Sequence, residues 1–94
     1  MPAKRIDEQT VNELFELILS LESVEDCKLL FEDLCTYKEV EQMAQRVKAA
    51  RLLIEGKTYS KVIEETDISS ATLSRVSRCV QYGGGYSKFL TQKN

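Results

Sequence analysis

Apolar residues recur at intervals of three and four positions along most of the chain, the spacing that places them on one face of an α-helix. This pattern predicts a first helix over about residues 7–20, a second from Ser23 to the loop at residues 34–36, and a third over about residues 37–55. Only one proline and four glycines occur among 94 residues, so no strand-rich region is expected. The pattern therefore predicts an all-α protein.

Polar residues mark where these helices begin and end. Ser23 with Asp26, and Thr36 with Glu39, have the spacing of a capping box, in which the first side chain caps the helix. Gly56 is expected to end the third helix in the left-handed conformation that glycine readily adopts. The expected inward side chains of that helix are Val40, Met43, Ala44, Val47, Ala50 and Ile54.

The first two helices carry apolar residues on more than one face. The first has an apolar stripe formed by Val11, Leu14, Phe15, Ile18 and Leu21. Leu17 and Leu19 widen this stripe. The second is expected to direct inward Val24, Cys27, Leu30, Phe31 and Leu34, with Leu29 in addition. A helix that is apolar nearly all round packs against more than one neighbour, and in so short a chain we expect a second copy to supply it. Cys27 and Cys35 are expected to be core thiols.

Residues 58–81 have the pattern of a helix-turn-helix. Val62 and Ile63 give the first short helix an apolar face, and Ile68 is expected to fill the turn. The second short helix continues the apolar stripe with Leu73, Val76 and Val80. Ser69 is expected to cap this helix, and Asp67 to take a left-handed backbone, which Asp tolerates better than most residues.

The exposed face of the second short helix favours contact with DNA. Its side chains are small, hydroxylated or basic, which suits a helix in the major groove beside phosphates: Ser70, Ala71, Thr72, Ser74, Arg75 and Arg78. No acidic residue occurs from position 69 to 81, in a chain that has 15. The alternative, a helical hairpin with a merely solvated polar face, fits this composition less well.

The charge is distributed unevenly. Residues 1–45 hold four basic and eleven acidic side chains, whereas residues 46–94 hold nine basic and four acidic, so a net charge of −2 combines an acidic half with a basic one. The basic half contains the helix-turn-helix, as expected for phosphate binding on one surface.

The residues after the helix-turn-helix are expected to form a flexible tail over residues 82–94. The three glycines that follow Tyr82 are expected to break the helix. Tyr86, Phe89 and Leu90 are expected to form one more amphipathic turn that docks on the core.

Several classes of function are disfavoured. The three cysteines lack metal-binding spacing and no histidine is present, so no metal site is expected. No catalytic constellation can be assembled, which predicts that the protein is not an enzyme. RNA binding is disfavoured because exposed aromatic platforms are lacking. No signal peptide and no apolar run of about 20 residues is present, which predicts a cytoplasmic protein without membrane contact.

From Thr36 onward the sequence resembles the Trp repressor family, and specifically its small YerC/YecD-type members. The resemblance rests on TYKEVEQMAQRVK at residues 36–48, LLIEGK at 52–57 and ISSATLSR at 68–75. It implies a Trp-repressor-like helical bundle over residues 1–94 as a single domain, with dimerisation and core helices at 7–55 and the helix-turn-helix at 58–81. It further implies an intertwined homodimer that regulates transcription, with two recognition helices reading a palindromic operator in double-stranded DNA about one helical turn apart, ~34 Å.

The resemblance also implies which residues face DNA and which bind a ligand. The family's DNA-facing positions fall on Tyr59, Ser60, Ile63, Ser70, Ala71, Thr72 and Ser74. Added affinity is expected from Lys57, Lys61, Arg75 and Arg78, with readout through water and DNA shape. The family's tryptophan-binding threonine and two arginines fall on Thr36, Arg46 and Arg75.

Two positions of the ligand site depart from the family pattern. Val76 replaces the glycine that makes room for the indole, and Cys79 replaces a serine near the ligand's amino group. A valine side chain should crowd a flat ring, because overpacking is costly. The departure favours an unidentified small anion as corepressor, or no ligand, over tryptophan, and no other cofactor is expected.

A second hypothesis is a protein-interaction module that docks on another regulator or on polymerase without specific DNA binding. The acidic side chains Glu8, Glu22, Glu25 and Glu32 are candidate docking charges. Only the DNA-binding hypothesis predicts a steep loss of affinity with salt and sensitivity to Arg78→Ala.

Overall fold

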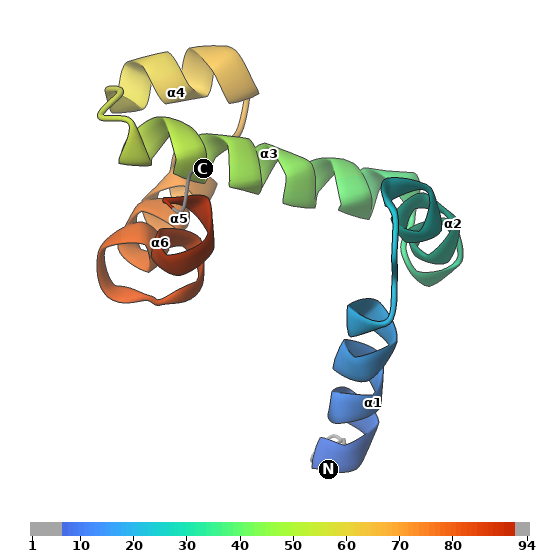
Figure 1. The fold of residues 1–94 in the computed structure, drawn as a ribbon. Coiled ribbons are helices and arrows are strands. Elements are labelled where there is room, and N and C mark those ends of the chain that lie inside the picture. Colours follow the sequence, from blue (N-terminus) through green and yellow to red (C-terminus); the bar gives the residue numbers. More distant parts are fainter. Residues whose placement is uncertain (1–6, 92–94) are drawn as a thin grey trace, which may run out of the picture. The chain divides into compact units, whose positions relative to one another are not determined.

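The computed structural model describes residues 7–91, in which every regular element is an α-helix. The helices are α1 (Glu8–Leu19), α2 (Val24–Leu34), α3 (Tyr37–Ile54), α4 (Tyr59–Thr66), α5 (Ser70–Tyr82) and α6 (Gly85–Leu90) (Figure 1). The predicted all-α class is confirmed. The chain divides into two compact units, one that ends at Thr36 and one that begins at Tyr37.

The two helices of the first unit begin at side-chain caps. The Asp7 carboxylate accepts the backbone N–H of Thr10 at 2.9 Å and so caps α1. This bond holds the pKa of the Asp7 carboxyl below its usual range, because it favours the charged form. Ser23 Oγ accepts the backbone N–H of Asp26 at 3.0 Å, as predicted for the start of α2. The Asp26 carboxylate in turn accepts the backbone N–H of Glu22 at 3.1 Å.

Neither α1 nor α2 has a buried residue. Phe15 of α1 is 58% exposed, whereas Phe31 of α2 is half-buried. The other exposed apolar side chains of these helices are Val11, Leu14, Leu17, Leu19, Val24, Leu29 and Leu34. The prediction that Cys27 and Cys35 are core thiols is wrong for the single chain, because Cys27 is exposed and Cys35 only half-buried. Most apolar side chains of α1 and α2 are thus exposed.

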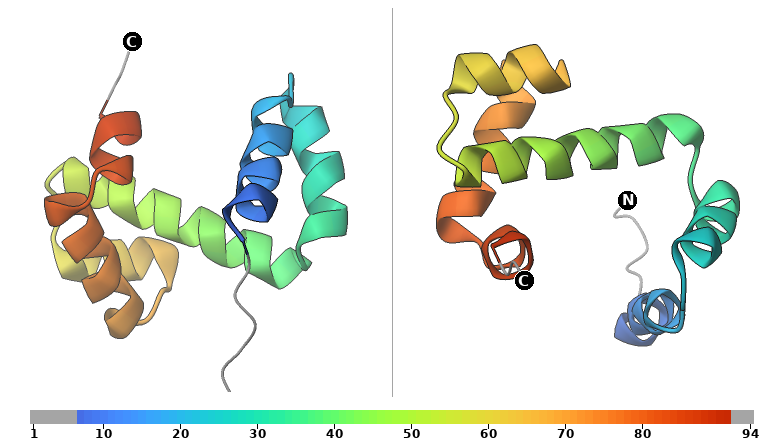
Figure 2. Two further views of the ribbon diagram at one scale, coloured as in Figure 1. Left: turned by 90° about the horizontal axis from the view of Figure 1, so that it is seen from below. Right: turned by 45° about the horizontal axis from the view of Figure 1, so that its top comes forward.

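The second unit packs α4, α5 and α6 around the C-terminal half of α3. α4 lies along one side of this part of α3, and α5 with α6 lie along the other (Figures 1 and 2). The buried apolar core contains residues from α3, α4, the turn and α5: Ala49, Ala50, Leu52, Val62, Ile68, Leu73 and Val76. Ala49 and Ala50 are fully buried, and their small side chains allow the neighbouring helices to approach α3 closely.

The inward stripe expected for α3 is only partly correct. Ala50 is buried, but Ala44 and Val47 are exposed, and the buried residues also include Ala49 and Leu52, which were not expected. Since α4, α5 and α6 all contact α3, burial extends around its C-terminal half and is not confined to a single stripe.

Gly56 ends α3 as predicted. Its φ of +92° is in the left-handed region. The N–H of Lys57 donates to the carbonyl of Leu52 and the N–H of Gly56 to that of Leu53, each at 3.0 Å, which is the Schellman pattern. These bonds satisfy the last carbonyls of α3 and turn the chain into α4.

α6 is the additional amphipathic turn that the sequence predicts. Tyr86 and Leu90, which are four residues apart on one helix face, pack against the core. Phe89, in contrast, is 67% exposed, so the expectation that it docks with them is wrong. Within residues 7–91, no helix is both long and apolar enough to cross a membrane.

Candidate nucleic-acid interface

The helix-turn-helix forms where the sequence predicts it. Thr58 Oγ1 accepts the N–H of Lys61 at 3.2 Å and caps α4, and Ser69 Oγ accepts the N–H of Thr72 at 3.1 Å and caps α5. Asp67 ends α4 at φ 62° and ψ 22°, the predicted left-handed conformation. Val62, Leu73 and other apolar residues of the motif are buried in the core, so α5 is held on a packed support.

The turn has an internal polar anchor that sequence reasoning missed. Thr66 is buried, and its hydroxyl donates to the carbonyl of Val62 at 2.7 Å. The same oxygen accepts the N–H of Ile68 at 3.5 Å. Its sequence signal is a threonine directly before the left-handed Asp67, where a hydroxyl can bond back to the carbonyl four residues earlier in α4. Thr66 thus joins the end of α4 to the apolar residue that fills the turn.

Most of the predicted DNA-facing side chains lie on the surface. Those that are exposed are Tyr59, Ser60, Lys61, Ser70, Ala71, Ser74, Arg75 and Arg78. Ile63 and Thr72 are half-buried, and Ile63 packs against the core. These two residues therefore also help to fix α4 and α5, and their contact with DNA stays a prediction.

The hydroxyl of Thr72 is already engaged at the start of α5. Its Oγ1 accepts a hydrogen bond from Ser69 Oγ at 3.0 Å, while its backbone N–H donates to that same Ser69 oxygen. Thr72 keeps its own hydroxyl hydrogen as a donor. These bonds hold the N-terminal turn of α5.

The predicted phosphate contacts differ in their surroundings. Lys61 Nζ lies 3.6 Å from a carboxylate oxygen of Glu65 and 4.0 Å from one of Glu64. Such exposed pairs contribute about 0–1 kcal/mol, so a phosphate can compete for this lysine. Within residues 7–91, Arg75 and Arg78 form no ion pair with a carboxylate, which leaves both guanidinium groups available to an anion.

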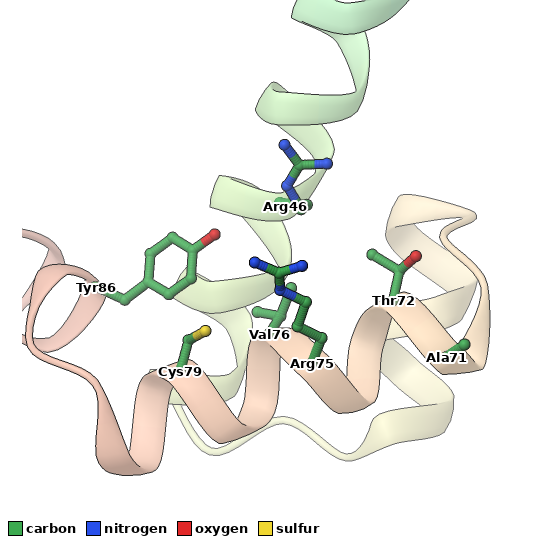
Figure 3. Close-up of a pocket in the computed structure, with 7 residues that line it drawn as sticks. All are labelled: Arg46, Ala71, Thr72, Arg75, Val76, Cys79 and Tyr86. Atoms are coloured by element: carbon green, nitrogen blue, oxygen red, sulfur yellow. The ribbon is translucent and has the colours of Figure 1, made fainter. Parts of the chain in front are cut away.

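A cavity of about 410 Å³ opens beside the recognition helix, between α3, α5 and α6. Its lining residues are Arg46, Ala71, Thr72, Arg75, Val76, Cys79 and Tyr86. Arg46 comes from α3, and Arg75 extends from α5 towards it (Figure 3). Tyr86 reaches in from α6, with its hydroxyl directed to the side where Arg46 lies (Figure 3). The cavity thus combines two cationic groups, a thiol and an aromatic ring.

The cavity contains two of the three predicted ligand-binding residues. Arg46 and Arg75 both line it, whereas Thr36 belongs to the other compact unit, so the role of Thr36 stays a prediction. Val76 is 1% exposed and belongs to the core while also lining the cavity. Tyr86 was missed because its place depends on how α6 folds back on α5, which no local motif specifies.

A second cavity of about 410 Å³ lies between α3 and the turn. Its lining is mostly polar and includes Arg46 and Thr72, which it shares with the first cavity: Lys38, Gln42, Gln45, Arg46, Asp67, Ile68, Ser69 and Thr72. Among the described residues, no group of three histidine, cysteine or acidic side chains could hold a metal ion. The polar groups of this second cavity are hydroxyls, side-chain amides, the cations of Lys38 and Arg46 and the carboxylate of Asp67.

Comparison with known proteins places this arrangement in a family. The family model described as Trp repressor protein matches residues 9–94. This chain belongs to the Trp repressor family. Over 83 residues it is 46% identical to the uncharacterized protein YerC of Bacillus subtilis (strain 168), a match that covers 88% of this chain and 80% of YerC.

Solved structures of other Trp repressor-like proteins have the same fold. A Trp repressor candidate from Staphylococcus aureus matches with a TM-score of 0.82 and 39% identity, over 86% of this chain and 82% of the other. A TrpR-like protein from Eubacterium eligens ATCC 27750 matches with a TM-score of 0.81 and 42% identity, over 84% of this chain and 82% of the other. The predicted Trp-repressor-like fold is thereby confirmed, and the chain is a member of a family of helix-turn-helix regulators.

Proposed function

We propose that this protein is a sequence-specific DNA-binding regulator of transcription, and not an enzyme. The observation that carries the proposal is the outer surface of α5, which exposes serine, alanine and arginine side chains and no carboxylate. Such a surface can enter the major groove without repelling phosphates. The packed core beneath α5 and the Thr66 anchor in the turn support a rigid presentation of this helix.

The proposed DNA contacts fall into two classes. Ser70, Ala71 and Ser74 near the start of α5 are proposed to meet base edges, where hydroxyls bond and Ala71 can touch a thymine methyl. Arg75, Arg78 and Lys61 are proposed to neutralise phosphates. Tyr59 and Ser60 lie at the exposed start of α4, where the first helix of such a motif crosses the DNA backbone.

We propose that the protein acts as a homodimer through α1 and α2. Both helices expose most of their apolar side chains in the single chain, including Phe15 and Leu29. Exposed apolar area of this extent indicates an interaction surface. A symmetric dimer would present two recognition helices to a palindromic operator, with half-sites ~34 Å apart.

A small anion is the ligand class that best fits the cavity beside α5. Arg46 and Arg75 offer guanidinium groups to a carboxylate or phosphate. Val76, which stands at the position where the family pattern has the glycine that makes room for the indole, lines this cavity, and a side chain there should crowd a flat ring. We therefore propose that DNA binding does not require tryptophan.

Selection of bound sequences from a random duplex pool, with and without tryptophan, tests the proposal. A palindromic motif that emerges in both conditions is the expected result. Enrichment only with tryptophan would contradict the proposal about the ligand. No enrichment in either condition, with the protein shown to be folded, would contradict specific DNA binding.

The alternative function is a docking module for another regulator or for polymerase. The exposed apolar faces of α1 and α2 are the observation that favours it, because a partner protein could cover them in place of a second copy. Salt titration separates the two: binding to duplex DNA weakens steeply as salt rises, whereas an apolar docking contact does not.

A further inference from the structure

The short helix α6 contacts the recognition helix and α3 at once. It packs against the C-terminal half of α5 and also against α3. Tyr86 and Leu90 pack against the core, as does Val80 of α5. Ser87 adds a polar contact, because its hydroxyl donates to the carbonyl of Val80 at 2.8 Å.

The chain can fold back in this way because residue 83 is a glycine. The N–H of Gly83 donates to the carbonyl of Cys79 at 2.9 Å and closes the end of α5. A Cβ atom at this position would lie only 2.8 Å from that same carbonyl oxygen. Gly83 therefore permits the close approach that starts the return of the chain towards α3.

The two halves of α5 are supported differently. The N-terminal half buries Leu73 and Val76 in the core. In the C-terminal half Ser77 is buried, but Cys79 and Val80 are only half-buried, and the side chain of Ser87 in α6 donates to the carbonyl of Val80. Arg78, which is proposed to contact phosphate, lies in this less buried half.

We propose that Tyr86 and Ser87 are positioning residues of the recognition helix. They hold the C-terminal half of α5 in place relative to α3, so that Arg78 is fixed before DNA arrives. The inference rests on the proposed function, and it assigns to residues 85–90 a role in DNA recognition. Tyr86 acts from within the arginine-lined cavity, where its ring lies between α3 and α5 (Figure 3).

Hydrogen exchange of the DNA-free protein tests directly whether Tyr86 and Ser87 hold the C-terminal half of α5 in place, a role that we call the brace. In Tyr86→Ala, the amides of Cys79, Val80 and their neighbours in α5 should exchange about tenfold faster, because local opening follows the loss of buried apolar contacts. Amides of α4 should keep their wild-type rates. Tyr86→Phe retains the ring and should restore slow exchange. Phe89→Ala is the matched control, since this aromatic residue of the same helix is exposed.

Ser87→Ala provides a second variant in case Tyr86→Ala does not fold. It removes one hydrogen bond and should raise exchange at the end of α5 by about fivefold. Affinity for the selected duplex should fall about tenfold in Tyr86→Ala and less in Ser87→Ala, with both Tyr86→Phe and Phe89→Ala close to wild type.

The outcomes separate the brace from the proposed function. Wild-type exchange in α5 and wild-type DNA affinity in both test variants would overturn the brace. Equal acceleration in α4 and α5 would also overturn it, because Tyr86 and Ser87 would then support only general stability. If the wild-type protein binds no duplex, the proposed function fails, and the exchange of α5 alone decides whether α6 holds this helix.

Discussion

At the scale of single residues, the hydroxyl of Thr66 has the most consequential position in the motif. It is buried between the carbonyl of Val62 and the N–H of Ile68 and bonds to both. A buried polar group without partners is costly, so each of these groups depends on the others. The Thr66 hydroxyl thus adds a buried polar link to a turn in which the N–H of Asp67 also donates to the carbonyl of Ile63 at 2.8 Å.

Thr66→Val should destabilise the protein by about 1–2 kcal/mol. The side chain keeps its shape, but the Val62 carbonyl and the Ile68 N–H each lose a partner. Urea denaturation followed by circular dichroism measures the loss as a lower midpoint with an unchanged slope. Ser60→Ala, an exposed change in α4, serves as the control. An unchanged midpoint in Thr66→Val would show that the turn does not depend on this hydroxyl.

Asp7 should titrate at a lower pH in the folded protein than in denaturant. Its carboxylate is stabilised by the Thr10 N–H, which lowers its pKa from 3.8. A lowered pKa in the folded state contributes stability above the unfolded pKa, and this contribution disappears as pH falls through the folded pKa. Carboxyl NMR titration in buffer and in urea measures both values. Identical pKa values would contradict the cap at the start of α1.

At the scale of elements, the turn that folds α6 back onto α5 depends on one of the three glycines at the junction, Gly83. A Cβ at Gly83 would come within 2.8 Å of the Cys79 carbonyl, whereas a Cβ at Gly84 would meet no atom within 4 Å. The three glycines, which look alike in the sequence, therefore have different structural requirements. This contrast supplies a matched pair of variants.

Gly83→Ala should lower the free energy of unfolding by about 1–3 kcal/mol, because the new methyl group forces α5 or the junction to shift. Gly84→Ala should be neutral or slightly stabilising, since alanine reduces the freedom of the unfolded chain. Thermal unfolding of the two variants provides the comparison. Equal losses of stability would contradict the close approach at residue 83.

The basic side chains of α5 should act mainly through phosphates. Arg78→Ala should lower affinity for the selected duplex and reduce the slope of log affinity against log salt by about 1. Fluorescence anisotropy at several salt concentrations measures both quantities. Lys48→Ala removes an exposed charge from α3 and should leave the slope unchanged. An unaltered slope in Arg78→Ala would exclude a phosphate contact at this position.

At the scale of the whole molecule, the first unit is incomplete in a single chain. Its two helices carry many apolar side chains and have no buried residue. Hydrophobic burial is the main favourable term in folding, so a partner that covers these side chains would stabilise the two helices. A second copy of the chain is the partner that we propose.

Leu17→Asp should weaken this dimer on the order of a hundredfold, because a charge would be taken into an apolar interface. Sedimentation equilibrium measures the dissociation constant. Glu16→Ala, on the neighbouring exposed position of α1, should leave it close to wild type. A folded Leu17→Asp protein with unchanged dimerisation would show that this side chain lies outside the interface.

The sequence by itself determined the features that depend on neighbours within a few residues. The caps at Ser23 and Ser69, the left-handed Asp67 and the end of α3 at Gly56 all formed as predicted, because their hydrogen bonds join residues close in sequence. The buried Val62, Leu73 and Val76 also followed from helical spacing, since each short helix offers only one apolar face to its support.

Only the tertiary structure decided which residues meet across helices. The burial of Ala49 and the place of Tyr86 beside Arg46 and Arg75 depend on where α4, α5 and α6 pack, and no local pattern encodes those positions. Lys61 lies three and four residues before Glu64 and Glu65, a spacing that permits ion pairs on one helix face, and the structure has both pairs, at 4.0 and 3.6 Å. Local hydrogen bonds fix helices and turns, whereas a site is formed by side chains far apart in sequence that packing brings together.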